Sequence, residues 1–237
     1  GRGAMLQEGL GRAAMLEEGM GGAALRQFAD RQANDPSSTG AISSTPVCDD
    51  TLATQPRLRP KGDALLQEAR RLQKANGAFA GANYLHAQIT GERWGITRTE
   101  LEDGFLRTVK AMMEAGEIQN THPPDRPYDP EKFASGKIGP NMYQVNSQVI
   151  MPVTKNDKLE FPGVSWSLMS NPLGALVTVF ITHAWAEGVF EFVEGALDKW
   201  PRSDPGGVEH AAYICFLSNP QHLDISGMLK EIDTSPF

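Results

Sequence analysis

The chain has 237 residues, an apolar content of 40% and a formal net charge of −7, a length that suits one large or two small domains. Residues 176–237 hold nine acids and three bases, so this segment carries −6 of the charge. Nucleic-acid binding needs clustered Lys and Arg. Because this segment is acidic instead, we do not expect nucleic acid as a partner. No apolar run approaches the roughly 18–20 residues of a membrane span, so we also expect no membrane insertion.

The cysteines and the termini point to an intracellular fragment. Cys48 lies in a Ser/Thr/Pro-rich stretch and Cys215 in an apolar run, and two such residues do not make a secreted disulfide framework. The N-terminus lacks the charged-then-apolar order of a signal peptide. We therefore predict a cytoplasmic protein. Because the sequence lacks an initiator Met and stops at Phe237 without a closing element, we expect it to be part of a longer protein.

The first sixty residues are predicted to be the least ordered. Residues 1–30 repeat with a period of ten, and each unit combines helix-favouring residues with glycines that disfavour a helix. Such a segment is either a repetitive assembly element or low-complexity sequence, and we favour the second. Residues 31–60 contain several prolines and read as a linker.

Residues 61–120 are predicted to form a small helical module. Asp63 is placed to cap a first helix whose apolar residues recur at helical spacing, and Gly77 ends it. A second helix is expected over 78–89. The segment balances eight bases with eight acids, which argues against a winged-helix DNA binder. Packing or protein interaction is the predicted role.

A third helix in this module has the clearest signals. Thr97 and Glu100 have the spacing of a capping box, and Gly116 is a natural stop. Between them an apolar stripe typical of a core is made by Leu101, Phe105, Val109 and Met112. Residues 121–142 are rich in Pro, Asp and Gly and read as a connector.

The α/β part is predicted to span 143–237. Residues 143–151 alternate like a half-buried strand that Pro152 ends. Residues 176–182 form a β-branched run without alternation, which is typical of a strand buried on both faces. An amphipathic helix over 189–200 and a second apolar strand over 211–217 follow.

Strand, helix and strand together make a βαβ unit. The 28 residues from His183 to His210 are enough for a crossover between parallel strands. Parallel strands present their carboxyl ends to one edge of the sheet, where open α/β folds bind ligands. We therefore predict a ligand-binding or interface site from the polar clusters that follow the two strands: Thr182, His183, Trp185 and Glu187, with Ser218, Asn219, Gln221 and His222.

Each candidate also has a structural interpretation. His183 and Glu187 suit an acid–base or ligand pair, but a histidine at a strand end is more often a structural hydrogen-bonding group. Trp185 would stack on a nucleotide base or pack under its loop. Residues 219–221 also suit a turn that needs a side-chain amide. Cys215 is interpreted as a core thiol inside the strand, and the absence of zinc-type spacing predicts no metal.

The segment Phe180-Ile-Thr-His-Ala-Trp-Ala-Glu187 resembles the first strand and following loop of TIR-like domains. The likeness is greatest to an algal and protist group in which this F-I-[ST]-H-A-W strand is paired with a later C-x-L-x-N-P-Q strand, here within Tyr213–Gln221. The upstream segments 143–146, 149–150 and 163–166 resemble the lead-in of that group. The resemblance thus covers about residues 140–237.

This resemblance implies an incomplete flavodoxin-like parallel sheet used for self-association in signalling and, in some relatives, for cleavage of NAD at its glycosidic bond. The loop after the second strand lines the assembly surface and the nucleotide cleft in such domains, and residues 218–224 take that place here. The catalytic carboxylate of NAD-cleaving members comes from a later helix, and the downstream Arg-x-Trp-Cys-x-x-Glu segment of the algal group is absent from this sequence.

We therefore expect a signalling or assembly protein that binds copies of itself or another protein through residues 183–187 and 218–224, without a bound cofactor. The alternative is a nucleotide-processing enzyme, such as an NAD glycohydrolase with NAD as substrate, that is active only at full length. A third interpretation is a helical adaptor whose α/β part is merely structural.

Overall fold

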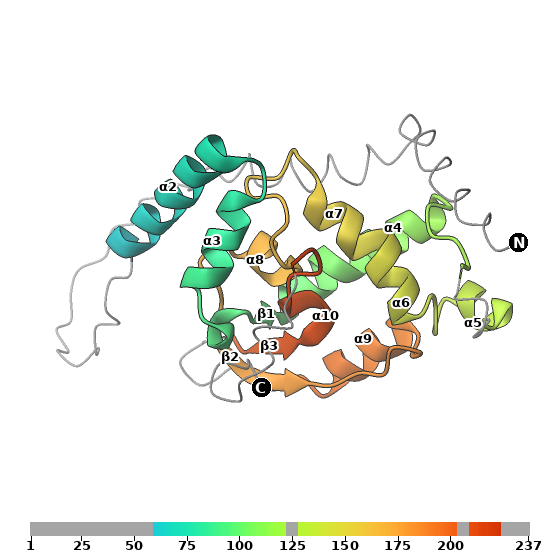
Figure 1. The fold of residues 1–237 in the computed structure, drawn as a ribbon. Coiled ribbons are helices and arrows are strands. Elements are labelled where there is room, and N and C mark those ends of the chain that lie inside the picture. Colours follow the sequence, from blue (N-terminus) through green and yellow to red (C-terminus); the bar gives the residue numbers. More distant parts are fainter. Residues whose placement is uncertain (1–58, 122–127, 203–208, 224–237) are drawn as a thin grey trace, which may run out of the picture.

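The computed structural model describes residues 59–121, 128–202 and 209–223 (Figure 1). The predicted low-complexity segment 1–60 therefore lies almost wholly outside the described residues. Helices and strands are mixed, and the strands form one small sheet. The elements, in chain order, are α2 (Arg59–Asn76), α3 (Ala80–Gln88), η1 (Gly91–Arg93), β1 (Ile96–Thr97), η2 (Glu100–Leu106), α4 (Arg107–Glu114), α5 (Pro130–Ala134), α6 (Met142–Val145), η3 (Asn146–Ile150), α7 (Met151–Lys155), α8 (Trp166–Ser170), β2 (Val177–Ile181), α9 (Val189–Asp198), β3 (Ala211–Ile214) and α10 (Cys215–Ser218).

The predicted helices of the 61–120 segment are present. Helix α2 begins at Arg59, so the prediction that Asp63 caps it is wrong, and it ends before Gly77, which has a φ of +102°. The capping box of the third helix is confirmed. The Thr97 backbone N–H donates to Glu100 Oε2 at 2.8 Å, and the Glu100 N–H donates to Thr97 Oγ1 at 3.2 Å.

Residues 143–151 are helical, so the strand predicted there is wrong. A second capping box starts this helix: the Gln144 N–H donates to Asn141 Oδ1 at 3.0 Å, and the Asn141 N–H donates to Gln144 Oε1 at 3.1 Å. Its buried residues recur at intervals of three and four, namely Met142, Val145, Val149 and Val153. The wider turn η3 precedes Pro152, which lets the helix continue to Lys155 despite the proline.

The sheet has the strand order β1–β3–β2. Strands β2 and β3 are adjacent and parallel, as predicted, with Val177 opposite Ala211 and Ile181 opposite Ile214. Strand β1 was not predicted, and it pairs with β3 in the antiparallel sense.

Strand β3 ends at Ile214, three residues before the predicted end. Cys215 therefore lies in the helical turn α10, and the prediction that it sits inside a strand is wrong. The Ile214 N–H donates to Ser218 Oγ at 3.0 Å, and the Asn219 N–H donates to the Cys215 carbonyl at 3.0 Å. These bonds close the turn and remove the backbone groups that would extend the strand.

Among the described residues β2 is an edge strand, and the prediction that both of its faces are buried is wrong. Its side chains alternate, with Val177, Val179 and Ile181 partly buried and Thr178 and Phe180 exposed. Phe180 is 49% exposed, and Leu176, immediately before the strand, is 56% exposed. The apolar run is thus continuous in sequence but half-buried in space.

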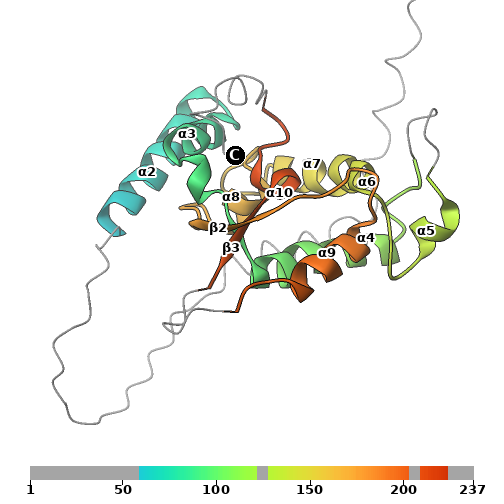
Figure 2. The ribbon, with the colours of Figure 1, turned by 90° about the horizontal axis from the view of Figure 1, so that it is seen from below.

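Helix α9 buries one side, as its amphipathic pattern predicts. The buried residues are Val189, Phe192, Val193 and Ala196. Figure 2 shows α9 and α10 on opposite sides of β2 and β3.

The predicted boundary between a helical module and an α/β part does not coincide with a gap in the packing. Ala69 and Phe105 belong to the same hydrophobic cluster as Val145, Trp166 and Leu217. No helix within the described ranges combines the length and apolar character required to cross a membrane.

Candidate functional site

The carboxyl ends of β2 and β3 meet at His183 and Cys215. His183 lies two residues beyond the end of β2, and Cys215 is the first residue after β3. The Cys215 Sγ lies 3.6 Å from His183 Nδ1 and 3.9 Å from Nε2. The parallel pairing of the strands therefore brings together one residue that we predicted for the site and one that we assigned to the core.

Aromatic side chains surround His183. Its ring centroid lies 4.7 Å from that of Phe216, 5.1 Å from that of Trp185 and 5.9 Å from that of Phe192. Trp185 in turn stacks on Tyr143 of α6, with centroids 5.2 Å apart, and Tyr143 is 39% exposed. The aromatic residues thus hold the loop after β2 against α6 and α10.

Burial keeps both members of the His183–Cys215 pair neutral. It lowers the pKa of His183 and raises the pKa of Cys215, although a backbone hydrogen bond from Phe216 partly opposes the second shift. A nucleophilic cysteine needs a lowered pKa and thus a thiolate. The pair consequently lacks the electrostatics of an activated cysteine–histidine nucleophile.

The polar residues after β3 are engaged inside the fold. Ser218 is buried in the turn of α10, and Asn219 Oδ1 accepts a hydrogen bond from the Tyr213 hydroxyl at 2.5 Å. Gln221 Nε2 donates to the Asn219 carbonyl at 3.0 Å. These three side chains stabilise the turn, in line with the structural interpretation of residues 219–221.

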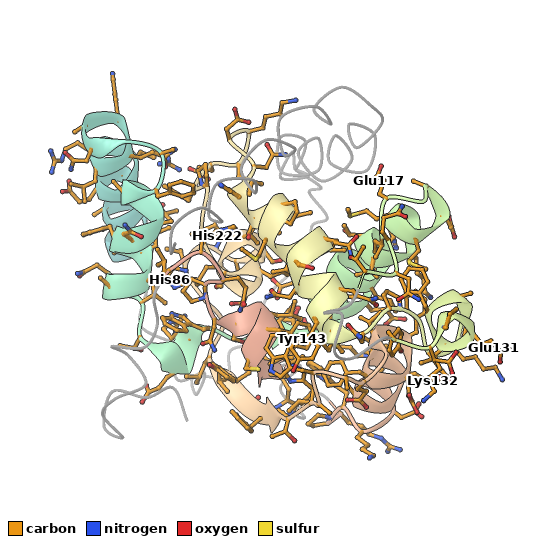
Figure 3. All side chains as sticks on the ribbon, turned by 45° about the vertical axis from the view of Figure 1, so that its right-hand side comes forward. His86, Glu117, Glu131, Lys132, Tyr143 and His222 are labelled. Atoms are coloured by element: carbon orange, nitrogen blue, oxygen red, sulfur yellow. The ribbon has the colours of Figure 1, made fainter. Side chains whose placement is uncertain are left out.

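His222 lies on another part of the molecule. Its Nε2 is 2.8 Å from the Met151 carbonyl, and its ring stacks on Phe79 with centroids 6.4 Å apart. Figure 3 shows His222 on the side of His86, well away from Tyr143. The second predicted cluster therefore does not join the first, and Asp224, the end of the predicted loop, lies outside the described residues.

Thr182 and Glu187 border a hollow of about 440 Å³ between β2 and α9. Glu187 Oε2 accepts a hydrogen bond from the Ala184 N–H at 3.4 Å. Apolar side chains, Thr182, two glutamates and one lysine form the walls of the hollow: Val179, Phe180, Ile181, Thr182, Glu187, Glu191, Phe192, Gly195, Ala196, Lys199 and Trp200. The sequence pattern did not point to this hollow, because its walls come from β2 and α9, which meet only in the folded chain.

Within the part of the chain that the structure describes, no three His, Cys, Asp or Glu side chains come close enough together to hold a metal ion. Comparison with known proteins adds no assignment, since no family model, no curated protein and no solved structure matches the sequence. The resemblance to TIR-like domains therefore stays a prediction.

Proposed function

We propose that this chain is a protein-binding module that takes up an extended segment of a partner on the open edge of its sheet. The proposal rests on the pairing and the exposure of β2. This five-residue strand pairs only with β3 among the described residues, and it exposes Phe180, while Leu176 is exposed immediately before the strand.

An edge strand presents a row of unpaired backbone N–H and C=O groups to any extended chain that approaches it. Added strands gain affinity from main-chain hydrogen bonds and specificity from alternate side chains. Phe180 is already in place for such contacts, because its ring stacks almost parallel on buried Tyr213, with centroids 5.5 Å apart. Few internal rearrangements are needed before a partner segment packs against it.

The proposal keeps the TIR-like, flavodoxin-like interpretation in a modified form. The parallel β2–β3 pair with its α9 crossover supports that fold, and assembly in signalling is the role that the resemblance implies. The binding surface differs from the predicted one. It consists of β2 with Thr182 and Glu187, whereas the residues around Ser218 serve the fold.

A peptide-display selection on the full 237-residue chain tests the proposal. A library of random dodecapeptides should yield binders to the wild type that are lost with Phe180→Lys, because a charge on an edge strand opposes strand addition. Phe79→Lys is the matched control, since Phe79 is a similarly exposed phenylalanine, 37% exposed, away from β2. Binders that both variants retain equally would contradict the proposal.

The enzymatic alternative expects activity only at full length, so it is tested with the full-length protein. Incubation with NAD should release no nicotinamide above the background of a buffer control. Release that scales with protein concentration would replace the binding proposal with NAD cleavage.

A further inference from the structure

We infer that the hollow beside β2 receives Lys or Arg side chains of the docked segment, so that the preferred partner is an extended peptide in which apolar and basic residues alternate. This inference rests on the proposed function and specifies the chemistry of the partner. It depends on the position of the hollow and on its charge.

The hollow lies where alternate side chains of an added strand would point. One wall consists of residues 179–182 of the edge strand and its end, and the opposite wall belongs to α9. Successive side chains of a strand point to opposite faces of the sheet. Every second side chain of a segment added to β2 would therefore enter the hollow, whose volume of about 440 Å³ is within the usual range of ligand pockets.

The charge of the hollow favours a basic side chain. Glu187 and Glu191 line it, and Lys199 is the only base in the lining. The ion pairs found among the described residues involve neither of the two glutamates. Two more acids, Glu194 and Asp198, are exposed on the same helix. An acidic segment would meet like charges here, whereas a lysine or arginine would meet carboxylates.

A second copy of this chain fits the site less well. Residues 177–181 carry no basic side chain that could pair with the Glu187 and Glu191 carboxylates of a second copy, so the charge complementarity that a basic peptide offers would be missing. The charge pattern thus favours a basic segment of a different chain.

Fluorescence anisotropy with two labelled octapeptides on the 237-residue chain tests the inference. We expect (Val-Lys)₄ to bind about tenfold or more tightly than (Val-Glu)₄ and to weaken as salt is added. Glu187→Gln with Glu191→Gln should weaken (Val-Lys)₄ binding by about tenfold. The matched control, Glu92→Gln with Glu114→Gln, changes two exposed acids elsewhere and should leave the affinity unchanged.

The outcomes separate this inference from the proposed function. Equal binding of both octapeptides, or no loss with the two glutamine substitutions, would overturn the inference while Phe180-dependent binding upheld the proposed function. Self-association of the chain that Phe180→Lys abolishes would also overturn it, because a second copy would then be the occupant. A failure of both octapeptides together with a display selection insensitive to Phe180→Lys would overturn both.

Discussion

Strands β1 and β2 are the two edge strands of the described sheet, and they differ in length and in exposure. β1 has two residues, with Ile96 fully buried and the backbone N–H of Thr97 bonded to Glu100. β2 has five residues, and its outward side chains, Thr178 and Phe180, are exposed.

In this comparison β1 is the edge that stabilises the fold, and β2 is the edge that we propose a partner binds. Proteins protect sheet edges by keeping them short or by placing charges or prolines on them. β1 is short, and the following helix takes up its backbone donor. β2 is an uncharged Val-Thr-Val-Phe-Ile segment, and no strand among the described residues pairs with its open side. An unprotected apolar edge is an aggregation hazard unless a partner covers it, which is why we assign function to β2.

The largest effect should come from damage to the protected edge. Ile96→Ala should lower the free energy of unfolding by about 3 kcal/mol, because it leaves a cavity in the core. Val179→Ala, on the partly buried face of β2, should cost about 1 kcal/mol, since less buried surface is lost. Urea denaturation of both variants measures the difference. Equal losses would mean that the two edges contribute alike to the fold.

The next effect is a pH dependence that originates beside the β1 edge. Buried His86 accepts a hydrogen bond from the Ser165 N–H at 3.0 Å through Nε2, and its ring meets Trp94 edge-on at 5.0 Å. Burial lowers the pKa of His86 from 6.5 to about 3. Below pH 6.5 the unfolded chain therefore binds a proton that the folded chain does not, and stability falls by about 1.4 kcal/mol per pH unit.

Urea denaturation between pH 7 and pH 4 measures this slope. In His86→Gln the slope over this range should decrease by about one proton, because the substituted residue does not titrate. Gln keeps an acceptor for the Ser165 N–H, which makes it the milder substitution. A wild-type slope that the variant retains in full would show that His86 is protonated in the folded state.

The contrast between the edges was only partly predictable from the sequence. The parallel β2–β3 pair was predictable because β-branched runs flanking an amphipathic helix are a local pattern. β1 was not, because two residues carry no periodicity and their partner, Ala212, lies more than a hundred residues later. The exposure of Phe180 also escaped prediction, since it depends on which strand lies next to β2.

The site shows the same division. His183 was predictable as a residue at a strand end, and Cys215 was missed because the apolar run continues through Leu217 and conceals the end of β3 at Ile214. A helix over 143–151 could have been predicted from the Asn141–Gln144 capping box, which starts it. Its alternation of apolar residues was coincidental, as the helical spacing from Met142 to Val153 fits the burial better.

A smaller pH effect is expected on the β2 side. Burial lowers the pKa of His183 as it does that of His86, but His183 is only partly buried, so its shift should be the smaller of the two. NMR titration of the histidine ring protons, with His183→Gln to assign the signal, compares them. A His183 pKa above 6.5 would mean that a nearby carboxylate raises this pKa by more than burial lowers it.

The smallest effect concerns the thiol beside that histidine. Burial raises the pKa of Cys215 above its ordinary value of 9.0, so little thiolate is present at pH 7.5. In a Cys48→Ser background, iodoacetamide should alkylate Cys215 more slowly than a cysteine in an unstructured peptide. Slow alkylation of Cys215 would agree with a binding role for the β2 side and would argue against a nucleophilic role for this thiol. A fast one would mean that His183 withdraws the proton, and that the strand ends form a nucleophile instead of a support for β2.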